Sequence, residues 1–185
     1  MNTLSYKTCL IIGGLLFLSM GFSFAATPAY KIKAAYIYQL TRFVTWPNVP
    51  RDINSPFNIC VLGKTSIGKE LKNIENRQEY GRQFHVIYPK NLTDTDMCHI
   101  IYLAKSNQNE LRAMLDLLEK QPVLTISSVP DFAYQGGVIG FVTDKNRIRM
   151  EINHAASLRA NIQLSAKLLE LAIPIKGNSS REFLR

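Results

Sequence analysis

The sequence predicts an α/β fold: a three-layer sandwich with a mostly parallel central sheet of about five or six strands, an antiparallel edge hairpin, and N- and C-terminal helices packed on it. Three apolar runs, at Phe57–Leu62, Cys98–Ala104 and Val123–Ser127, indicate strands that are buried on both faces, as parallel strands are. Amphipathic segments with helical spacing separate these runs. Two further strands, Val138–Val142 and Arg147–Ile152, follow each other closely across a polar turn, which is typical of a hairpin.

The first 25 residues have the layout of a secretory signal peptide. Lys7 supplies a positive charge, residues 10–22 are almost wholly apolar, and Ser23-Phe24-Ala25 places small residues at a cleavage site. The apolar stretch is shorter than the roughly 20 residues that span a bilayer, so an uncleaved anchor is the less favoured alternative. We therefore expect a signal peptide at residues 1–25, a single domain at residues 26–185, and a location in the periplasm.

A first helix is expected from Pro28 to Val44, where apolar residues recur at helical spacing. Trp46-Pro47 ends it, because a residue before proline avoids the helical region. This segment carries more aromatic side chains than one buried stripe needs. They either cover the core alone or form a protein-binding surface, in which aromatic residues and arginine are favoured. The candidate partner-binding residues here are Tyr36, Tyr38, Arg42, Phe43 and Trp46.

The remaining elements follow from the same patterns. A strand is expected at Gln83–Tyr88, an amphipathic helix at Gln108–Lys120 and a short helical segment at Val129–Tyr134. One long helix, His154–Leu171, is expected to close the fold, and the tail Gly177–Arg185 is expected to be frayed.

A glycine-rich turn, Gly63–Gly68, joins the first buried strand to a short helix that runs to about Glu75. Such a turn can bind phosphate at the start of a helix. Its two glycines, however, fit neither the P-loop nor the dinucleotide-binding fingerprint. The sequence therefore favours an ordinary strand–helix turn over a phosphate site.

The strand Arg147–Ile152 alternates polar and apolar residues, so it has one polar face. Arg149 and Glu151 lie on that face. Either they form a solvated edge with a weak pair between them, or they form a polar site for an anion or a partner chain.

Two cysteines, Cys60 and Cys98, remain after the leader is removed. An even pair in an oxidising compartment most often forms a disulfide, and the alternative is two separate buried thiols. Bridging requires the strand at Phe57–Leu62 to lie beside the strand at Cys98–Ala104.

The sequence offers little for catalysis. The formal charge of +8 is spread along the chain, and an exported basic protein is more suited to acidic partners or membrane surfaces than to nucleic acid. The histidines, His85, His99 and His154, lack metal-ligand spacing, and no hydrolase or nucleotide motif is present. We expect a protein without enzymatic activity, cofactor or metal.

The ordered set of segments resembles the YfiR family. The resemblance rests on KAAYIYQLTRFVTWP (Lys33–Pro47), FNICVLG, CHIIYL, PVLTIS, the glycine pair before VIGFV, and RIRMEINHAA with the following LSAKLLELA. It implies a periplasmic repressor that contacts the periplasmic region of an inner-membrane diguanylate cyclase, and that an outer-membrane OmpA-like lipoprotein can sequester.

The resemblance also implies site residues. Cys60 and Cys98 match the family's structural disulfide, whereas the second cysteine pair of some members has no counterpart in Tyr134–Phe141. The partner-binding residues would be those of the aromatic helix together with Arg149 and Glu151. The alternative to a repressor is a periplasmic small-ligand sensor or solute-binding module, and a homodimer is a further expected partner state.

Overall fold

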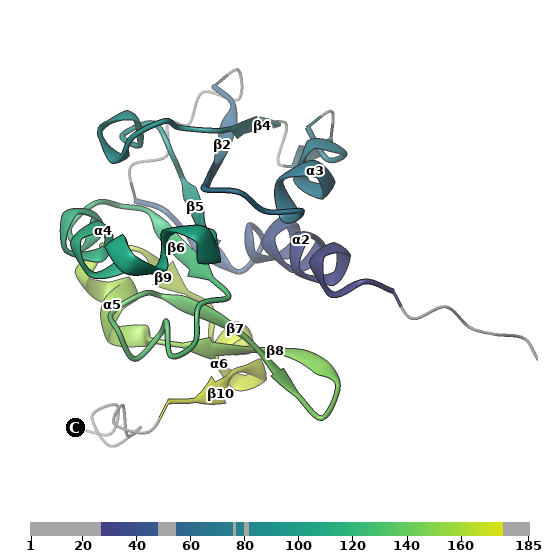
Figure 1. The fold of residues 1–185 in the computed structure, drawn as a ribbon, viewed down its shortest axis with the longest axis vertical. Coiled ribbons are helices and arrows are strands. Elements are labelled where there is room, and N and C mark those ends of the chain that lie inside the picture. Colours follow the sequence, from purple (N-terminus) through teal and green to yellow (C-terminus); the bar gives the residue numbers. More distant parts are fainter. Residues whose placement is uncertain (1–26, 48–54, 76, 80–81, 176–185) are drawn as a thin grey trace, which may run out of the picture.

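A computed structural model describes residues 27–47, 55–75, 77–79 and 82–175 (Figure 1). The predicted signal peptide and the predicted frayed tail, Gly177–Arg185, lie outside the described residues.

The central sheet has the strand order β10-β8-β7-β6-β5-β2-β4-β3. Strands β4, β2, β5, β6 and β7 pair in parallel, and β8 runs antiparallel to β7. Only the short β10 lies beyond the hairpin at that end of the sheet. This architecture confirms the predicted fold class. The strands are β2 (Phe57–Leu62), β3 (Gln78–Glu79), β4 (Arg82–Ile87), β5 (Ile100–Leu103), β6 (Leu124–Ser127), β7 (Ile139–Asp144), β8 (Arg147–Ile152) and β10 (Ile173–Pro174).

Side chains of a buried strand alternate between the two faces of the sheet, so both faces of this sheet are apolar. Helices cover both faces. In β2, Ile59 and Val61 join the larger core beneath α2 (Ala29–Leu40), α3 (Ile67–Lys72) and α6 (Ala166–Leu171). Cys60 and Leu62 join the smaller core beneath α4 (Leu111–Leu118). Short 3-10 turns, η1 (Leu92–Asp94) and η2 (Lys105–Glu110), lie in the connections. Figure 1 shows α2 and α3 side by side, away from α4.

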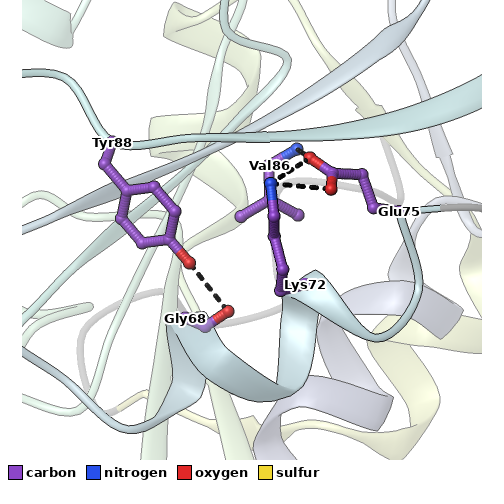
Figure 2. A network of polar contacts seen from close by, with 5 residues as sticks. All are labelled: Gly68, Lys72, Glu75, Val86 and Tyr88. Carbon is purple, nitrogen blue, oxygen red and sulfur yellow. Dashed lines mark hydrogen bonds and ion pairs between the residues drawn. The ribbon is translucent and has the colours of Figure 1, made fainter.

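A polar network fixes α3 and the turn after it to β4 (Figure 2). The Glu75 carboxylate accepts a hydrogen bond of 2.8 Å from Lys72 Nζ and one of 3.2 Å from the Val86 backbone N–H. The Tyr88 hydroxyl donates to the Gly68 carbonyl at 2.9 Å. The bond from Lys72 is the main cause that lowers the pKa of Glu75, and burial is the cause that raises the pKa of Tyr88.

The first helix is shorter than predicted. It ends at Leu40 instead of Val44, and Val44–Thr45 forms β1, which pairs antiparallel with β9 (Gln163–Leu164). The Ser165 backbone N–H donates to the Phe43 carbonyl at 2.9 Å next to this pair. A distant segment of the chain therefore pairs with residues that the sequence analysis placed in the last turn of the helix.

The prediction of one closing helix over His154–Leu171 is wrong, because the segment forms two short helices with β9 between them. α5 (His154–Arg159) ends before Asn161, whose φ of 54° lies in the left-handed region that asparagine tolerates. After β9, Ser165 begins α6 by accepting a hydrogen bond from the Leu168 backbone N–H. Apolar spacing alone did not reveal this break.

The segment Val129–Tyr134 forms turns and not the predicted helical segment. Asp131 has a φ of 57°, which a helix cannot accommodate. The turns bury Phe132 against the sheet, and its ring lies where a Cβ on Gly137 would be. A glycine is therefore required at Gly137.

Candidate functional site

Four of the predicted partner-binding residues, Tyr36, Tyr38, Arg42 and Phe43, lie on or just after α2, and we call them the α2 patch. Tyr36 is half-buried, with its ring 6.2 Å from that of Phe141. Tyr38 is also half-buried and meets the Phe84 ring edge-on at 5.4 Å. Both rings thus pack on the core, Tyr36 over β7 and Tyr38 over β4. Because β6, β5 and β2 separate these two strands, the rings lie on opposite sides of α2.

The α2 patch is positively charged. The guanidinium of Arg42 and that of Arg77 each lie 5.7 Å from the centre of the Tyr38 ring, and both residues are exposed. The two guanidinium groups thus place two positive charges beside one rigid aromatic ring. This surface is suited to an acidic partner.

Trp46 does not share the surface of the α2 patch, contrary to the expectation that grouped it with the helix. It is only 8% exposed. Its indole N–H donates to the His99 carbonyl at 3.0 Å, and its ring meets Phe57 edge-on at 5.0 Å. The indole therefore serves the core and has little area left for a partner.

Arg149 and Glu151 form a second patch, the β8 patch, on the opposite face of the sheet. The intervening Met150 packs against the core beneath α2, so its neighbours along the strand point the other way. The structure thus separates the two groups that the sequence analysis had joined. No ion pair between Arg149 and Glu151 occurs in the described part of the chain.

Glu151 is the unusual member of the β8 patch. Its Oε2 atom is buried and has no hydrogen-bond partner among the described residues. Burial raises the pKa of its carboxyl group, and the nearby Asp131 raises it further.

At the amino ends of the parallel strands, Asn58 and His99 form a polar pair between β2 and β5. The Asn58 backbone N–H donates to His99 Nδ1 at 3.0 Å, and its side-chain Nδ2 donates to the Met97 carbonyl at 2.9 Å. The His99 ring stacks on Phe57 at 4.5 Å. Burial, then the charge of Arg82, lowers the pKa of His99 to about 4, so this histidine is neutral at neutral pH.

A cavity of about 370 Å³ opens beside this pair. Arg82 lines it and is 8% exposed. Its guanidinium donates to the carbonyls of Ser55, at 2.8 Å, and Pro56, at 3.2 Å. Sequence analysis missed both Asn58 and Arg82. A polar residue inside the apolar run FNICVLG was the available signal for Asn58, and nothing distinguished Arg82 from other surface arginines.

The structure joins Cys60 and Cys98 by a disulfide, with their Cα atoms 5.8 Å apart. The pairing of β2 with β5 brings the two residues together, as bridging required. Cys60 is fully buried, and Cys98 also lines the cavity. The bond therefore holds the wall of the cavity in place.

The carboxyl ends of the strands, where α/β sheets usually bind ligands, are closed by the chain itself. Gly63 has a φ of 86°, and the side chains of Ser106 and Asn107 occupy the space over it. Ser106 Oγ accepts a hydrogen bond of 3.0 Å from the Lys64 backbone N–H. These contacts support the ordinary strand–helix turn over a phosphate site.

A short hydrogen-bond network links α2 to the sheet. Lys33 Nζ donates to Ser128 Oγ at 2.9 Å, and the Tyr102 hydroxyl lies 3.0 Å from the same oxygen. Burial, and secondarily Lys105, lowers the pKa of Lys33, while burial raises the pKa of Tyr102. The sequence analysis did not anticipate this network.

No metal-binding group of three or more His, Cys, Asp or Glu residues occurs in residues 27–47, 55–75, 77–79 and 82–175. Within the same ranges, no helix has the length and apolar character needed to cross a bilayer.

The comparisons with known proteins agree with the fold. No curated protein matches the chain. A solved structure, described as a conserved domain protein from Vibrio cholerae O1 biovar eltor str. N16961, is similar with a TM-score of 0.55 and 11% sequence identity. The match covers 82% of this chain and 62% of that structure's chain, and at such low identity it shows the fold alone.

A family model is more informative, because it matches residues 30–173, from α2 to the start of β10. Its description is YfiR/HmsC-like, in agreement with the resemblance found in the ordered segments. The matched region contains both cysteines, the α2 patch and the β8 patch. The chain therefore belongs to the YfiR/HmsC-like family.

Proposed function

We propose that this protein is a periplasmic regulator that binds the periplasmic region of an inner-membrane diguanylate cyclase and holds the enzyme inactive. The match to the YfiR/HmsC-like family over residues 30–173 carries the proposal. A repressor of this kind needs only a higher affinity for the inactive state of its target, and no active site. The buried disulfide is compatible with export to an oxidising compartment.

The α2 patch is the docking surface that we favour. Its best-defined part combines the half-buried Tyr38, a ring that loses little conformational freedom on binding, with the guanidinium groups of Arg42 and the neighbouring Arg77. The formal charge of +8 also favours approach to an acidic surface. An acidic face on the cyclase's periplasmic region is the expected complement.

The test measures binding of the purified protein to the periplasmic region of a diguanylate cyclase from the same organism. Arg42→Glu should weaken the affinity at least about tenfold, because it places a negative charge against an acidic partner. Arg112→Glu makes the same charge change on α4, where Arg112 is 78% exposed, and should leave the affinity unchanged. Equal effects of both variants would reject the α2 patch, and no binding to any cyclase would reject the function.

The β8 patch is tested in the same assay with Arg149→Glu. Because Arg149 lies on the opposite face of the sheet, a partner that docks on the α2 patch alone should not sense this change. Loss of affinity with Arg149→Glu and retention with Arg42→Glu would move the docking surface to β8.

Two further partners belong to the proposal: an outer-membrane OmpA-like lipoprotein that competes with the cyclase, and a second copy of the chain. Competition predicts that the lipoprotein's periplasmic domain releases the bound cyclase region. Light scattering of the purified protein gives the oligomeric state directly. A ternary complex of the regulator with both proteins would contradict the competition.

A second candidate function is a periplasmic small-ligand sensor, and the cavity beside Asn58 and His99 favours it. Its volume of about 370 Å³ falls within the range of roughly 300–1,000 Å³ that is usual for ligand sites. A ligand that raises the melting temperature without any protein partner would support this role, which is compatible with repression.

A further inference from the structure

The antiparallel hairpin leaves the outer side of β8 largely uncovered. β7 pairs with β8 along its whole length, from Arg147 to Ile152. On the other side, the short β10 pairs only with Glu151 and Ile152. Among the described residues, no strand lies beside residues 147–150 on the side away from β7, where the hairpin extends beyond β10 in Figure 1. Such an open edge is a template on which another strand can pair.

The register determines which backbone groups of β8 point to the open side. The Asn153 backbone N–H, directly after β8, donates to the Val138 carbonyl at 2.9 Å. Alternate residues of an antiparallel pair bond to the neighbouring strand, so every second residue of β8 counted back from Asn153 bonds to β7. The residues between them, Ile148 and Met150, therefore point their backbone groups away from β7.

β10 leaves three of these backbone groups without a partner strand. In a parallel pair, a residue bonds to the two residues that flank its opposite, so Ile173, opposite Glu151, reaches no further along β8 than the Met150 carbonyl. The Ile148 N–H, the Ile148 carbonyl and the Met150 N–H have no strand beside them in the described part of the chain. They match the main-chain hydrogen bonds by which an added strand binds to a sheet edge.

The charges around the open edge indicate what kind of strand fits it. Arg147, Arg149 and Lys145 of the adjacent turn are exposed, and none of them forms an ion pair with a described residue. Asp144 lies opposite Arg147 and does not pair with it either. Antiparallel pairing with a second copy of β8 would place arginine opposite arginine, which is destabilising. An acidic strand would instead bring opposite charges together.

The other face of the edge is apolar. Ile148 is buried, and the half-buried Met150 packs against the core beneath α2. Because successive side chains of a strand point to opposite faces, a matching strand alternates acidic and apolar residues. Its acidic residues lie beside Arg147 and Arg149, and its apolar residues lie beside Ile148 and Met150.

We propose that the open edge of β8 binds an extended acidic segment of a partner protein, which adds a strand to the sheet. Main-chain hydrogen bonds to Ile148 and Met150 hold the segment, and Arg147 and Arg149 select its charge. This interaction goes beyond the proposed repression, because it requires neither the α2 patch nor a cyclase.

The probe is a capped peptide, acetyl-Ser-Val-Glu-Val-Glu-Val-Ser-amide, titrated into the purified mature protein by calorimetry. It should bind at least about tenfold more tightly than the same peptide with lysine in place of glutamate. Arg147→Glu combined with Arg149→Glu should reverse this preference, and Arg112→Glu on α4 should leave it unchanged. Because all three arginines are exposed, the variants should fold.

Two further peptides, N-methylated at the valines or at the glutamates, test the backbone bonds. An added strand turns only every second N–H towards β8, so one of the two should lose at least about tenfold in affinity and the other should bind like the parent. Loss with methylated valines indicates antiparallel addition, and loss with methylated glutamates indicates parallel addition. Equal affinities of the two N-methylated peptides would overturn the proposal.

Hydrogen exchange measured by NMR locates the peptide. In the free protein the Ile148 and Met150 amides should exchange faster than the Arg149 amide, which bonds to β7. Saturating peptide should slow the first two at least about tenfold and leave Arg149 unchanged. The proposal is also overturned if Ile148 and Met150 are already as protected as Arg149, if the peptide does not slow them, or if the preference survives charge reversal.

The peptides are measured without a cyclase, and the effect of Arg42→Glu on cyclase binding is measured without a peptide. Failure of one set of measurements therefore leaves the other intact.

Discussion

At the scale of single residues, the polar atoms beside the disulfide have the most distinctive chemistry. His99 Nδ1 accepts a hydrogen bond from the Asn58 backbone N–H, and the His99 carbonyl accepts one from the Trp46 indole N–H. The His99 ring stacks on Phe57. The bond to Nδ1 requires a neutral ring, because a protonated Nδ1 cannot accept, and the stacking on Phe57 holds the ring in position. The histidine is thus part of the structure.

His99 predicts a pH dependence of stability. Its pKa is about 4 in the folded protein, against an ordinary value of 6.5. The unfolded chain therefore takes up a proton between these two values while the folded chain does not, so the free energy of unfolding should rise with pH from about 4 to 6.5. We expect a loss of roughly 1–2 kcal/mol from pH 7.5 to pH 5, measured by urea denaturation.

The matched variants are His99→Asn, which keeps an acceptor for the Asn58 N–H without titrating, and His85→Asn at an exposed position on β4. The first should flatten the pH profile and the second should not. A wild-type profile that is flat between pH 4 and 6.5 would contradict the prediction.

At the scale of elements, the N-cap residues of α5 and α6 make different numbers of hydrogen bonds and should differ in their contribution to stability. Asn153 Oδ1 accepts from the Ala156 backbone N–H at 2.9 Å, and its Nδ2 donates to the Ala133 carbonyl at 2.8 Å. Ser165 Oγ only accepts from the Leu168 N–H, at 3.3 Å. Asn153 thus caps α5 and also holds the turns at Val129–Tyr134.

Asn153→Ala should lower the free energy of unfolding by about 2 kcal/mol, because it removes a cap and also leaves the buried Ala133 carbonyl with only the 3.4 Å bond from the Gly136 backbone N–H. Ser165→Ala, which removes a cap alone, should cost about 0.5–1 kcal/mol. Urea denaturation of both variants gives the comparison. Equal costs would show that the bond to Ala133 contributes nothing.

The junction of α3 and β4 is held by Glu75 (Figure 2). Glu75→Gln removes the charge that pairs with Lys72 and should speed hydrogen exchange of the Val86 amide, while the control Glu70→Gln, on α3, should not. The pKa of Glu75 is lowered in the folded state, so its contribution to stability is present above its ordinary pKa of 4.5 and is lost as the pH falls through the lower folded value. Unchanged exchange of Val86 in Glu75→Gln would contradict this role.

At the scale of the whole molecule, the disulfide links β2 to the segment just before β5 and closes a loop that contains α3 and β4. Its ends are 38 residues apart in sequence, so on the chain-entropy estimate it stabilises the fold by about 4 kcal/mol. The Cys60→Ala, Cys98→Ala double variant should lose roughly this much in urea denaturation. Wild-type protein with a reducing agent should approach the same midpoint. A loss below about 1 kcal/mol would show that the bond is dispensable.

The arrangement of the whole molecule also limits how partners can bind. The α2 patch and the β8 patch lie on opposite faces of one sheet, so a single flat surface cannot cover both. The cavity lies at a third place, the amino ends of the strands. Trp46 connects two of these regions, because it follows the end of α2 and lines the cavity.

Features that depend on neighbouring residues could be predicted from the sequence alone. Continuous apolar runs identified β2, β5 and β6, because these strands are buried on both faces. Alternation identified β8 and its polar face, and the ordered segments identified the family. The prediction that adjacent strands could bring Cys60 and Cys98 together also depended only on this strand pattern.

Features that depend on contacts between distant segments became visible in the three-dimensional structure. The pairing of Val44–Thr45 with Gln163–Leu164 shortened α2 and divided the closing helix, yet two-residue strands leave no periodic signal. The burial of Trp46, the separation of Arg149 from the α2 patch, and the meeting of Asn58, Arg82 and His99 around one cavity have the same origin. Periodicity specifies which face of an element is apolar, and the packing of the other elements determines which polar groups meet at its ends.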